Sequence, residues 1–504
     1  MQTAAGTSIP DWLRQRAQST SSRLALICGN DRLTHAQLDT TVDAAADHLR
    51  EAGLQVGATV ALLARNGTGF VVTVHAIARL GAVLMPLNVR LAPAELAWQL
   101  RDGGATHLLH DDSQRETITA LRGEASPLQI IPLEALSSRL PSHVGARHAS
   151  PLRTEDARFH LSNTHSLVYT SGTTGTPKGA ILTYSNHLWS AVGSALNLGL
   201  HEDDRWLACL PLFHVGGLAI LLRSVIYGIT AIVHETFDPA RVNAAIDEEG
   251  VTIVSVVANM LQRMLDERGD APYPATLRCV LLGGGPAPEP VLRRCARLGV
   301  PVVQTYGLTE TASQVATLAP EDALRKLGSA GKPLFGAELR IETPDGRVLP
   351  PASEGEIVVR GPTVTPGYLN SPEASAQALR GGWLHTGDIG YLDAEGYLYV
   401  LDRRDDLIVS GGENVYPAEI EAVLQSHPDV AEAGIFGVPD ERWGQTPIAA
   451  VVLRPGATAT PETLLTYCRE RLAAYRTPSR IEFRADLPRN AAGKLMRGRL
   501  REPW

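Results

Sequence analysis

Short apolar runs alternate along the first part of the chain with stretches in which apolar residues recur every three or four positions. Residues 24–28 are an apolar run that predicts a strand, and the Gly-Asn-Asp at 29–31 predicts a turn. Thr34 and Gln37 have the spacing of a capping box, which predicts that a helix begins there. This helix, which we expect to end at Gly53, has one apolar face made of Leu38, Val42, Ala45 and Leu49.

The same alternation continues through the middle of the chain. Further strands are predicted at residues 60–63, 82–87, 106–110, 128–132, 251–257, 277–282 and 302–305. Helices are predicted at residues 71–80 and 185–198, and residues 135–160 are predicted to be a linker. Because strands alternate with helices, we expect an α/β fold in which helices cover mostly parallel sheets.

The pattern changes after about residue 339, where short strands and Gly/Pro turns predict a small β-barrel-like subdomain. Its strands are expected at residues 356–360, 383–384 and 397–401. A polar run at 402–406 then predicts a hinge. The remaining residues, with helices near 417–426 and 461–474 and strands near 433–438 and 448–453, predict a small, mobile α+β domain. We therefore expect a large domain at 1–401, a hinge at 402–406 and a second domain at 407–504.

Composition narrows the classes of function. The net charge of −8 argues against general nucleic-acid binding, which needs a basic face. Five widely spaced cysteines without a C-x-x-C motif indicate buried thiols in a reducing cytoplasm. The N-terminus lacks the features of a signal peptide. The most apolar run, 215–233, contains Arg223 and Gly228, so we expect a buried core segment and no integral membrane segment.

One stretch, Y-T-S-G-T-T-G-T-P-K-G at 169–179, has the chemistry of a phosphate-binding loop. Glycines let the backbone approach a ligand closely, hydroxyls and backbone N–H groups can donate to an anion, and Lys178 adds a positive charge. The order of residues differs from that of P-loop NTPases, because Pro177 precedes the lysine and Gly179 follows it. The alternative is a flexible surface loop, which does not account for the Lys-Gly ending.

Lysine usage supports this interpretation. Of the 46 basic residues only four are lysines, namely Lys178, Lys326, Lys332 and Lys494. Lysine is a compact point charge whereas arginine is a planar fork, so the two are not interchangeable at a tight phosphate or carboxylate site. Because the chain otherwise uses arginine, we regard Lys178 and Lys494 as candidates for a phosphate or carboxylate site.

Seven motifs in order resemble the adenylate-forming superfamily, which includes acyl-CoA synthetases, peptide-synthetase adenylation domains and firefly luciferase. They are the loop at 169–179, G-G-G-P (283–286), Q-T-Y-G-L-T-E-T (304–311), H-T-G-D (385–388), D-R-R-D-D-L-I (402–408), S-G-G-E-N-V-Y-P-A-E-I-E (410–421) and P-R-N-A-A-G-K (488–494). The resemblance covers essentially the whole chain. It implies that a carboxylate attacks the α-phosphate of MgATP, and that a thiol then displaces AMP after the small domain has swung.

The resemblance also implies a set of site residues. The ATP-binding set is Thr170, Ser171, Gly172, Thr173, Thr174, Gly175, Lys178, Gly283, Gly284, Gly285, Pro286, Tyr306, Gly307, Asp388 and Arg403. Within it, residues 283–286 and Tyr306 are implied to sandwich the adenine, and Asp388 and Arg403 to bind the ribose hydroxyls. The catalytic set is Lys494, Thr309, Glu310 and His214. Glu310 is implied to hold Mg²⁺, Asp405 to be the hinge residue, and the glycines at 411–412 to replace Lys494 in the thiol step.

Further stretches are similar to the o-succinylbenzoate–CoA ligase family of menaquinone (vitamin K2) biosynthesis. Among them are I-P-D-W-L-R-Q-R-A (9–17), D-R-W-L-A-C-L-P-L-F-H (204–214) and R-S-V-I-Y-G-I-T (223–230), and Asp402 follows this family as well. The implied substrates are o-succinylbenzoate, ATP and CoA. Another aryl- or acyl-CoA ligase and a carrier-protein-loading adenylation domain are the alternatives. The sequence leaves open whether the chain forms a homo-oligomer.

Arg223 is the residue that bears most directly on the acyl substrate. A guanidinium inside an apolar run needs an anionic partner, because an unpaired buried charge is costly. One interpretation is an internal salt bridge, or a side chain that reaches the surface. The other places Arg223 with His214 and Ser313 in the acyl pocket, where it binds the second carboxylate of o-succinylbenzoate.

Overall fold

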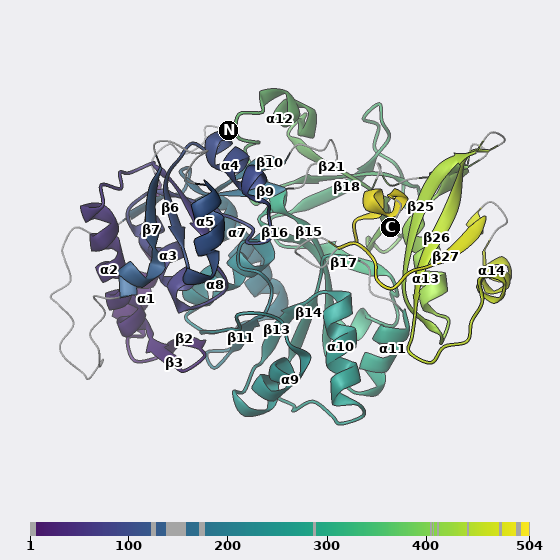
Figure 1. Ribbon diagram of the computed structural model, residues 1–504, viewed down its shortest axis with the longest axis horizontal. Coiled ribbons are helices and arrows are strands. Elements are labelled where there is room, and N and C mark those ends of the chain that lie inside the picture. The colour runs from purple at the N-terminus through teal and green to yellow at the C-terminus, as the bar shows by residue number, and fades with distance from the viewer. Residues whose placement is uncertain are drawn as a thin grey trace.

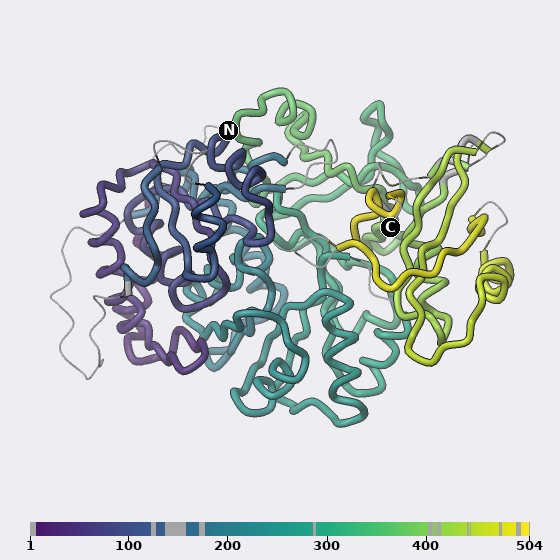
Figure 2. The backbone as a smooth tube through the Cα atoms, in the orientation of Figure 1, coloured from purple at the N-terminus to yellow at the C-terminus, as the bar shows by residue number. Residues whose placement is uncertain are grey.

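A large domain of sheets and helices carries a smaller domain at its C-terminal end (Figure 1). The computed structural model describes residues 7–121, 128–137, 158–170, 177–285, 289–403, 406, 408–410, 413–440, 443–472, 476–489 and 495–502. The backbone trace shows the small domain, coloured yellow-green to yellow, beside the strands that follow residue 300 (Figure 2).

The first sheet of the large domain ends in the hairpin that presents the predicted phosphate loop. Its strands lie in the order β10 (Lys178–Thr183), β9 (Thr164–Thr170), β5 (Val83–Pro86), β4 (Thr59–Leu63), β6 (Ala105–His110) and β7 (Gln129–Pro132). All neighbours in this sheet are parallel except β9 and β10. A separate two-stranded pair joins β1 (Ser8–Pro10) to β8 (Arg158–His160).

The second sheet is longer and changes from parallel to antiparallel pairing along its width. Its order is β18 (Glu338–Glu342), β19 (Gly355–Arg360), β21 (Trp383–Leu392), β22 (Leu398–Arg403), β17 (Ser329–Pro333), β16 (Ser313–Leu318), β15 (Val302–Leu308), β14 (Cys279–Leu282), β13 (Ile253–Val256), β11 (Arg205–Ala208), β12 (Thr230–Val233), β2 (Leu24–Cys28) and β3 (Asp31–Thr34), with β20 (Leu379–Arg380) beside β21. The strands from β15 to β2 pair in parallel. The antiparallel strands at the β18 end are the part for which the sequence predicts a separate subdomain.

Helices pack between and around these sheets. They are α1 (Trp12–Ser19), α2 (His35–Glu51), α3 (Thr68–Arg79), α4 (Pro93–Asp102), α5 (Arg115–Leu121), α6 (Leu133–Ser137), α7 (Tyr184–Leu198), α8 (Val215–Tyr227), α9 (Pro239–Glu248), α10 (Ala258–Arg268), α11 (Glu289–Arg297) and α12 (Pro372–Ala378). The largest buried cluster joins apolar side chains of α2, α3 and α8 to strands of both sheets. Burial of this apolar area is the main stabilising contribution that holds the two sheets together.

The C-terminal domain has its own sheet and core. Its strands lie in the order β24 (Glu413–Val415), β23 (Ile408–Ser410), β26 (Gly444–Leu453) and β25 (Val430–Asp440), with β27 (Arg480–Phe483) parallel to β26. The helices α13 (Pro417–Gln425) and α14 (Pro461–Arg469) pack their apolar residues onto this sheet. This is the small α+β domain expected from the sequence.

The fold class predicted from the sequence is confirmed. Thr34 and Gln37 form the capping box of α2, whose buried face contains the predicted Leu38, Val42, Ala45 and Leu49. The apolar run at 215–233 forms helix α8 and strand β12, and both are buried. Within the described residues, no helix combines the length and the apolar character needed to span a bilayer.

Three predicted boundaries were wrong. The strand expected at 302–305 extends to Leu308, because its end pairs with β16 across a register shift. The strand expected at 383–384 is part of a strand ten residues long, β21, which tolerates Gly387 through a local bulge. The linker expected at 135–160 overlaps two elements, because residues 135–137 belong to α6 and residues 158–160 form β8, while residues 138–157 lie outside the described part of the chain.

Candidate active site

The hairpin β9–β10 places the two ends of the predicted phosphate loop opposite each other. Thr170 and Lys178 are partners in its register, and the Thr170 hydroxyl donates to the carbonyl of Lys178 at 3.5 Å. One residue before the loop, the phenol of Tyr169 donates to Asp102 Oδ2 at 2.7 Å. The loop residues predicted to bind phosphate, namely Ser171, Gly172, Thr173, Thr174 and Gly175, lie outside the described residues.

A tyrosine that the sequence argument missed joins this hairpin to Glu310. The Tyr368 phenol donates to Glu310 Oε1 at 2.8 Å, and the Nζ of Lys178 lies 5.7 Å from the centre of the Tyr368 ring. The segment that carries Tyr368 extends the hairpin, since Leu369 N donates to Gly179 O at 2.8 Å. The available sequence signal was the Pro-Gly pair at 366–367 just before Tyr368, and it does not indicate a partner 58 positions away.

The turn after Glu310 has a strained backbone. Ala312 and Ser313 both have positive φ, 51° and 99°, which is costly for residues with a Cβ. The turn also presses against Gly307, where an added Cβ would lie 1.8 Å from the carbonyl oxygen of Ser313. Thr309 and Glu310 form the 3₁₀ turn η2 (Thr309–Thr311) just before this point, and Thr365 N donates to the Glu310 carbonyl at 2.7 Å. The backbone of the motif Q-T-Y-G-L-T-E-T is therefore fixed on both sides.

The residues predicted to hold the adenosine also come together. The Tyr306 phenol donates to Asp388 Oδ2 at 2.6 Å, although the two residues lie on different strands, β15 and β21. Asp388 pairs in register with Arg403 on β22. At the end of β14, a Cβ on Gly283 would lie 3.1 Å from Thr305, the neighbour of Tyr306. These contacts join Tyr306 to Asp388 and place Gly283 beside the residue that precedes Tyr306.

His214 lies at the N-terminal end of α8. Burial lowers the pKa of its imidazole to about 4, with a smaller contribution from the positive charge of Arg90, so the ring is neutral at pH 7. Its Nε2 is buried and has no hydrogen-bond partner among the described residues. The adjacent Val215 packs in a small apolar cluster with Val168, Leu182 and Ala312. Helix α8, the hairpin and the strained turn therefore meet beside His214.

Arg223 is buried without a carboxylate partner in the described part of the chain. It is 2% exposed, so the alternative in which it reaches the surface is wrong. Its Nη2 donates to Ser190 Oγ at 2.8 Å, and its guanidinium lies 5.8 Å from the centre of the Trp206 ring. Burial lowers the pKa of Arg223. Its Nε has no partner among the described residues.

Ser190 connects Arg223 to the strained turn. Its hydroxyl donates to the carbonyl of Ala312 at 2.6 Å while accepting from the guanidinium. Arg223 is therefore linked by two hydrogen bonds to Ala312, the residue that precedes Ser313. Ala312 also packs with Val215, the residue that follows His214, so the backbone positions of the three predicted substrate residues lie in one region.

Several predicted residues lie outside what the structure describes: Pro286, Asp405, Lys494 and the glycines at 411–412. For Arg403 only the backbone is described. Of the other lysines, Lys326 forms two ion pairs within the protein, with Asp393 and Glu395 each 2.6 Å from its Nζ. The scarcity of lysine therefore did not by itself mark a ligand site.

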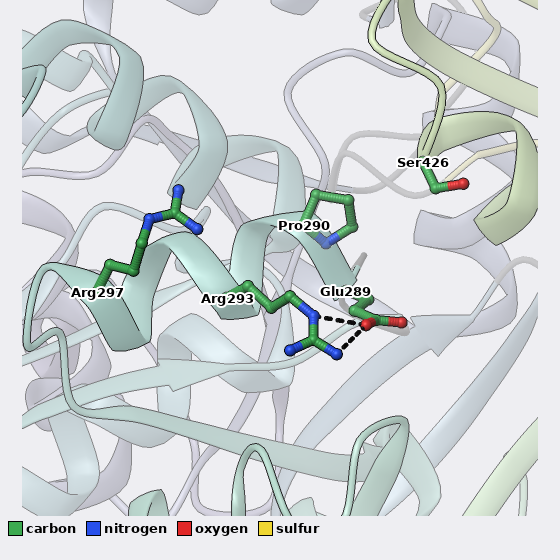
Figure 3. Close-up of a pocket in the computed structure, with 5 residues that line it drawn as sticks. All are labelled: Glu289, Pro290, Arg293, Arg297 and Ser426. Carbon is green, nitrogen blue, oxygen red and sulfur yellow. Dashed lines mark hydrogen bonds and ion pairs between the residues drawn. The ribbon is translucent and has the colours of Figure 1, made fainter.

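The two domains touch through polar contacts. The Tyr416 phenol donates to Glu354 Oε2 at 2.6 Å. Asn259 on α10 donates to Glu432 Oε1 at 3.1 Å, and the other oxygen of Glu432 accepts from Arg489 at 2.7 Å. A cavity of about 390 Å³ also lies between α11 and the small domain (Figure 3). Its lining includes Glu289 and Arg293, paired at 2.6 Å, but none of the predicted site residues.

The chain is similar to known proteins along nearly its whole length. The family model of the AMP-binding enzyme matches residues 13–369, and that of the AMP-binding enzyme C-terminal domain matches residues 419–494. The 2-succinylbenzoate–CoA ligase of Geobacillus kaustophilus (strain HTA426) is 54% identical over 98% of both chains. The chain belongs to the 2-succinylbenzoate–CoA ligase family of AMP-binding enzymes.

Solved structures of a relative in different complexes differ in their similarity to this chain. The o-succinylbenzoate CoA synthetase of Bacillus subtilis in complex with its acyl-adenylate intermediate is 45% identical, with a TM-score of 0.90 over 99% of both chains. Its complex with ATP and a magnesium ion also scores 0.90, over 98% of this chain and all of the other. A double mutant of the same Bacillus subtilis enzyme, bound with its product analogue OSB-NCoA, scores 0.74 at the same identity and over 99% of both chains. Over the whole chain, the structure is therefore more similar to the adenylate-bound and ATP-bound relatives than to the double mutant.

Proposed function

We propose that this chain ligates o-succinylbenzoate to CoA in two steps, releasing pyrophosphate and then AMP, for menaquinone biosynthesis. In the first step a carboxylate oxygen of the substrate attacks the α-phosphorus of ATP, and the bond to pyrophosphate breaks. In the second step the CoA sulfur attacks the acyl carbon, and AMP leaves. Negative charge grows on the phosphates in the first step, so pre-placed cations and donors lower its barrier.

The nucleotide occupies the edge that contains Tyr306 and Asp388. Asp388, with Arg403 opposite it in the register, holds the ribose hydroxyls. The face of Tyr306 and the glycines at 283–285 hold adenine, since the absence of a Cβ allows a flat ring to approach the strand end closely. The loop between β9 and β10, ending in Lys178, binds the β- and γ-phosphates, and Thr309 contacts the α-phosphate.

Glu310 is suited to hold Mg²⁺. Mg²⁺ prefers hard oxygen ligands and is commonly held by one or two carboxylates together with substrate phosphates. Tyr368 donates to Oε1 of Glu310 and so fixes the orientation of the carboxylate. The relative from Bacillus subtilis has been solved with ATP and a magnesium ion. When bound, the ion neutralises charge on the phosphates.

Arg223 is the observation that carries the choice of acyl substrate. o-Succinylbenzoate has two carboxylates, and the one that is not activated needs a cationic or donor-rich site. Arg223 is fully buried, has no carboxylate partner among the described residues and is linked through Ser190 to the turn at Ser313. His214 closes the same pocket as a neutral ring. A mono-acid substrate would leave the buried guanidinium without a counter-charge.

The small domain completes the first step and then moves. Lys494 bridges the substrate carboxylate and the α-phosphate during adenylation only. We place the large domain at 1–401, the hinge at 402–406 with Asp405 as the pivot, and the mobile domain at 407–504. After rotation the glycines at 411–412 take the place of Lys494. We assign the protein to the cytoplasm, where its five free thiols stay reduced.

The test is direct. The purified protein is incubated with o-succinylbenzoate, ATP, Mg²⁺ and CoA, and the products are identified by mass spectrometry. We expect the mass of the acyl-CoA together with AMP, and no thioester when ATP or CoA is omitted. A panel of benzoate, malonate and fatty acids serves as the control. A larger kcat/KM for one of these acids than for o-succinylbenzoate would overturn the substrate assignment and leave the ligase chemistry standing.

A further inference from the structure

The strand that carries Asp388 bulges just before this residue. Across the pair β19–β21, Glu356 is opposite Ile389 while Val358 is opposite His385. Two steps along β19 therefore correspond to four along β21, so Thr386, Gly387 and Asp388 lie opposite the single residue Ile357. Gly387 has φ of +72°, a left-handed conformation that favours glycine. The direction in which Asp388 points depends on the shape of this bulge.

The carboxylate of Glu356 fills the bulge. Its Oε1 accepts from Gly387 N at 3.1 Å, and its Oε2 lies 3.1 Å from Nδ1 of His385. Arg380 approaches the same oxygen at 3.7 Å. Glu356 is 7% exposed, so these contacts are made largely out of water, where hydrogen bonds to a charged group are strong.

The Thr386 hydroxyl makes a second set of hydrogen bonds on the other side of the bulge. It donates to the carbonyl of Ile357 at 2.7 Å and accepts from Asp388 N at 3.1 Å. The bulge is therefore held to β19 by one carboxylate and one hydroxyl. Asp388, itself 6% exposed, is then placed so that Tyr306 can donate to it.

We propose that Glu356 is a positioning residue for the nucleotide: it fixes the bulge at Gly387 and thereby aims Asp388 at the ribose hydroxyls. This proposal rests on the proposed function, because it uses Asp388 as the ribose ligand. It predicts that loss of Glu356 weakens ribose recognition specifically. Binding of the phosphates and of the acyl substrate, which depends on other elements, is unaffected.

The test compares two nucleotides on the full-length protein. Glu356→Leu removes both acceptors at similar volume, and Glu356→Gln keeps an acceptor for Gly387 N. With ATP, we expect Glu356→Leu to raise KM by roughly tenfold or more, the size of a lost charge-assisted hydrogen bond, and Glu356→Gln to raise it less. The KM for o-succinylbenzoate stays the same. With 2′,3′-dideoxy-ATP, which offers Asp388 no hydroxyl, wild type and variants have equal KM.

Control variants separate positioning from general damage. Glu338→Gln changes a surface carboxylate on the neighbouring strand β18 that pairs with Arg360 at 2.6 Å. We expect it to leave the KM values for both nucleotides unchanged. In an Asp388→Asn background, Glu356→Leu causes no further rise in the KM for ATP. If Glu356→Leu does not fold, Thr386→Val removes the hydrogen bonds of the Thr386 hydroxyl and gives the same selective loss for ATP. An equal loss for ATP and its dideoxy analogue overturns the proposal.

Calorimetric binding keeps this test independent of the ligase reaction. ATP and dideoxy-ATP are titrated into wild type and Glu356→Leu without acyl substrate or CoA. A narrower affinity gap between the two nucleotides in the variant supports the positioning role even if the protein activates a different acid. An unchanged gap overturns it even if o-succinylbenzoate is the substrate.

Discussion

The phenol of Tyr368 donates a 2.8 Å hydrogen bond to Oε1 of Glu310, while the same ring lies 5.7 Å from the ammonium of Lys178. One tyrosine thus contacts both the proposed metal ligand and the lysine of the proposed phosphate loop. Its position is fixed by the backbone, because Leu369 N donates to Gly179 O.

Glu310→Gln should raise the Mg²⁺ concentration needed for half-maximal adenylation, because an amide oxygen is a poorer ligand for a hard cation than a carboxylate. Tyr368→Phe keeps the carboxylate and the ring but releases the hydrogen bond, so we expect only a few-fold loss of rate, about the worth of one such bond. ATP–pyrophosphate exchange at varied Mg²⁺ measures both. Unaltered Mg²⁺ dependence in Glu310→Gln would show that the metal is held elsewhere.

Lys494→Ala should abolish adenylation while sparing the second step. The lysine neutralises charge that exists only on the way to the adenylate, so we expect a loss of roughly 10²–10³ in rate. Transfer to CoA from supplied acyl-adenylate should continue, because Lys494 has then moved away. Single-turnover assays of each half-reaction measure the two effects. Equal losses in both would contradict the rotation of the small domain.

Arg223→Met should raise the KM for o-succinylbenzoate by about 10–150-fold, corresponding to about 1.5–3 kcal/mol for a charge-assisted contact. The KM for ATP should hardly change. The matched control is a substrate analogue without the second carboxylate, for which wild type and variant should have similar KM. If the variant instead lowers the melting temperature and leaves every KM as it was, the arginine is structural.

Stability should fall as the pH is lowered from about 6.5 to about 3. Burial lowers the pKa of His75 to about 4 and that of His187 to about 3, the latter with help from Arg223. In this window the unfolded chain binds protons that the folded chain does not, so the free energy of unfolding falls as the pH falls. The loss is roughly 3–5 kcal/mol per histidine once both states are protonated. Urea unfolding across pH measures this.

A non-titrating variant identifies the contribution of one histidine. His75→Gln should flatten the pH dependence over the same window, whatever its stability at pH 7. His201→Gln, at an exposed position, should leave the dependence as in wild type. An equally steep dependence in His75→Gln and wild type would exclude this ring as a source of acid sensitivity.

Asn259→Ala should shift the balance between the domain arrangements. It removes the bond from α10 to Glu432 but leaves the contact of Glu432 with Arg489 inside the small domain. Loss of one such bond, about 0.5–1.5 kcal/mol, should slow adenylation by about 2–10-fold without slowing transfer to CoA. Gln262→Ala is the control, because Gln262 is on the same helix and its side chain donates to Asp266 of that helix at 2.7 Å. Slowing of both steps by Asn259→Ala would contradict this.

The sequence predicted the elements whose signals are local. Periodicity placed α2 and its buried face, and the capping box of Thr34 and Gln37 located its first turn. The ordered motifs placed Tyr306 and Asp388 in one site before any contact was known. Register could not be predicted, because a bulge such as that at Gly387 depends on the partner strand.

Residues that act through distant partners were missed. Tyr368 is 58 positions from Glu310, and Glu356 is 29 positions from His385. A tyrosine and a glutamate in a strand-rich region have many structural uses, so composition and spacing do not mark them. For Arg223 the sequence showed the buried charge, but only the structure shows that Ser190 and Trp206 are its neighbours rather than a carboxylate.

The close packing of Gly307 against Ser313 also limits how this enzyme can be altered. A library that varies Ser313 to accept new acids keeps the chain in a backbone conformation that disfavours β-branched side chains, and any side chain at 307 would collide with the turn. Ser190 and Arg223, which reach the same turn through the carbonyl of Ala312, lie on regular helices and carry no such backbone restriction. Efforts to redirect substrate choice should therefore begin with helices α7 and α8.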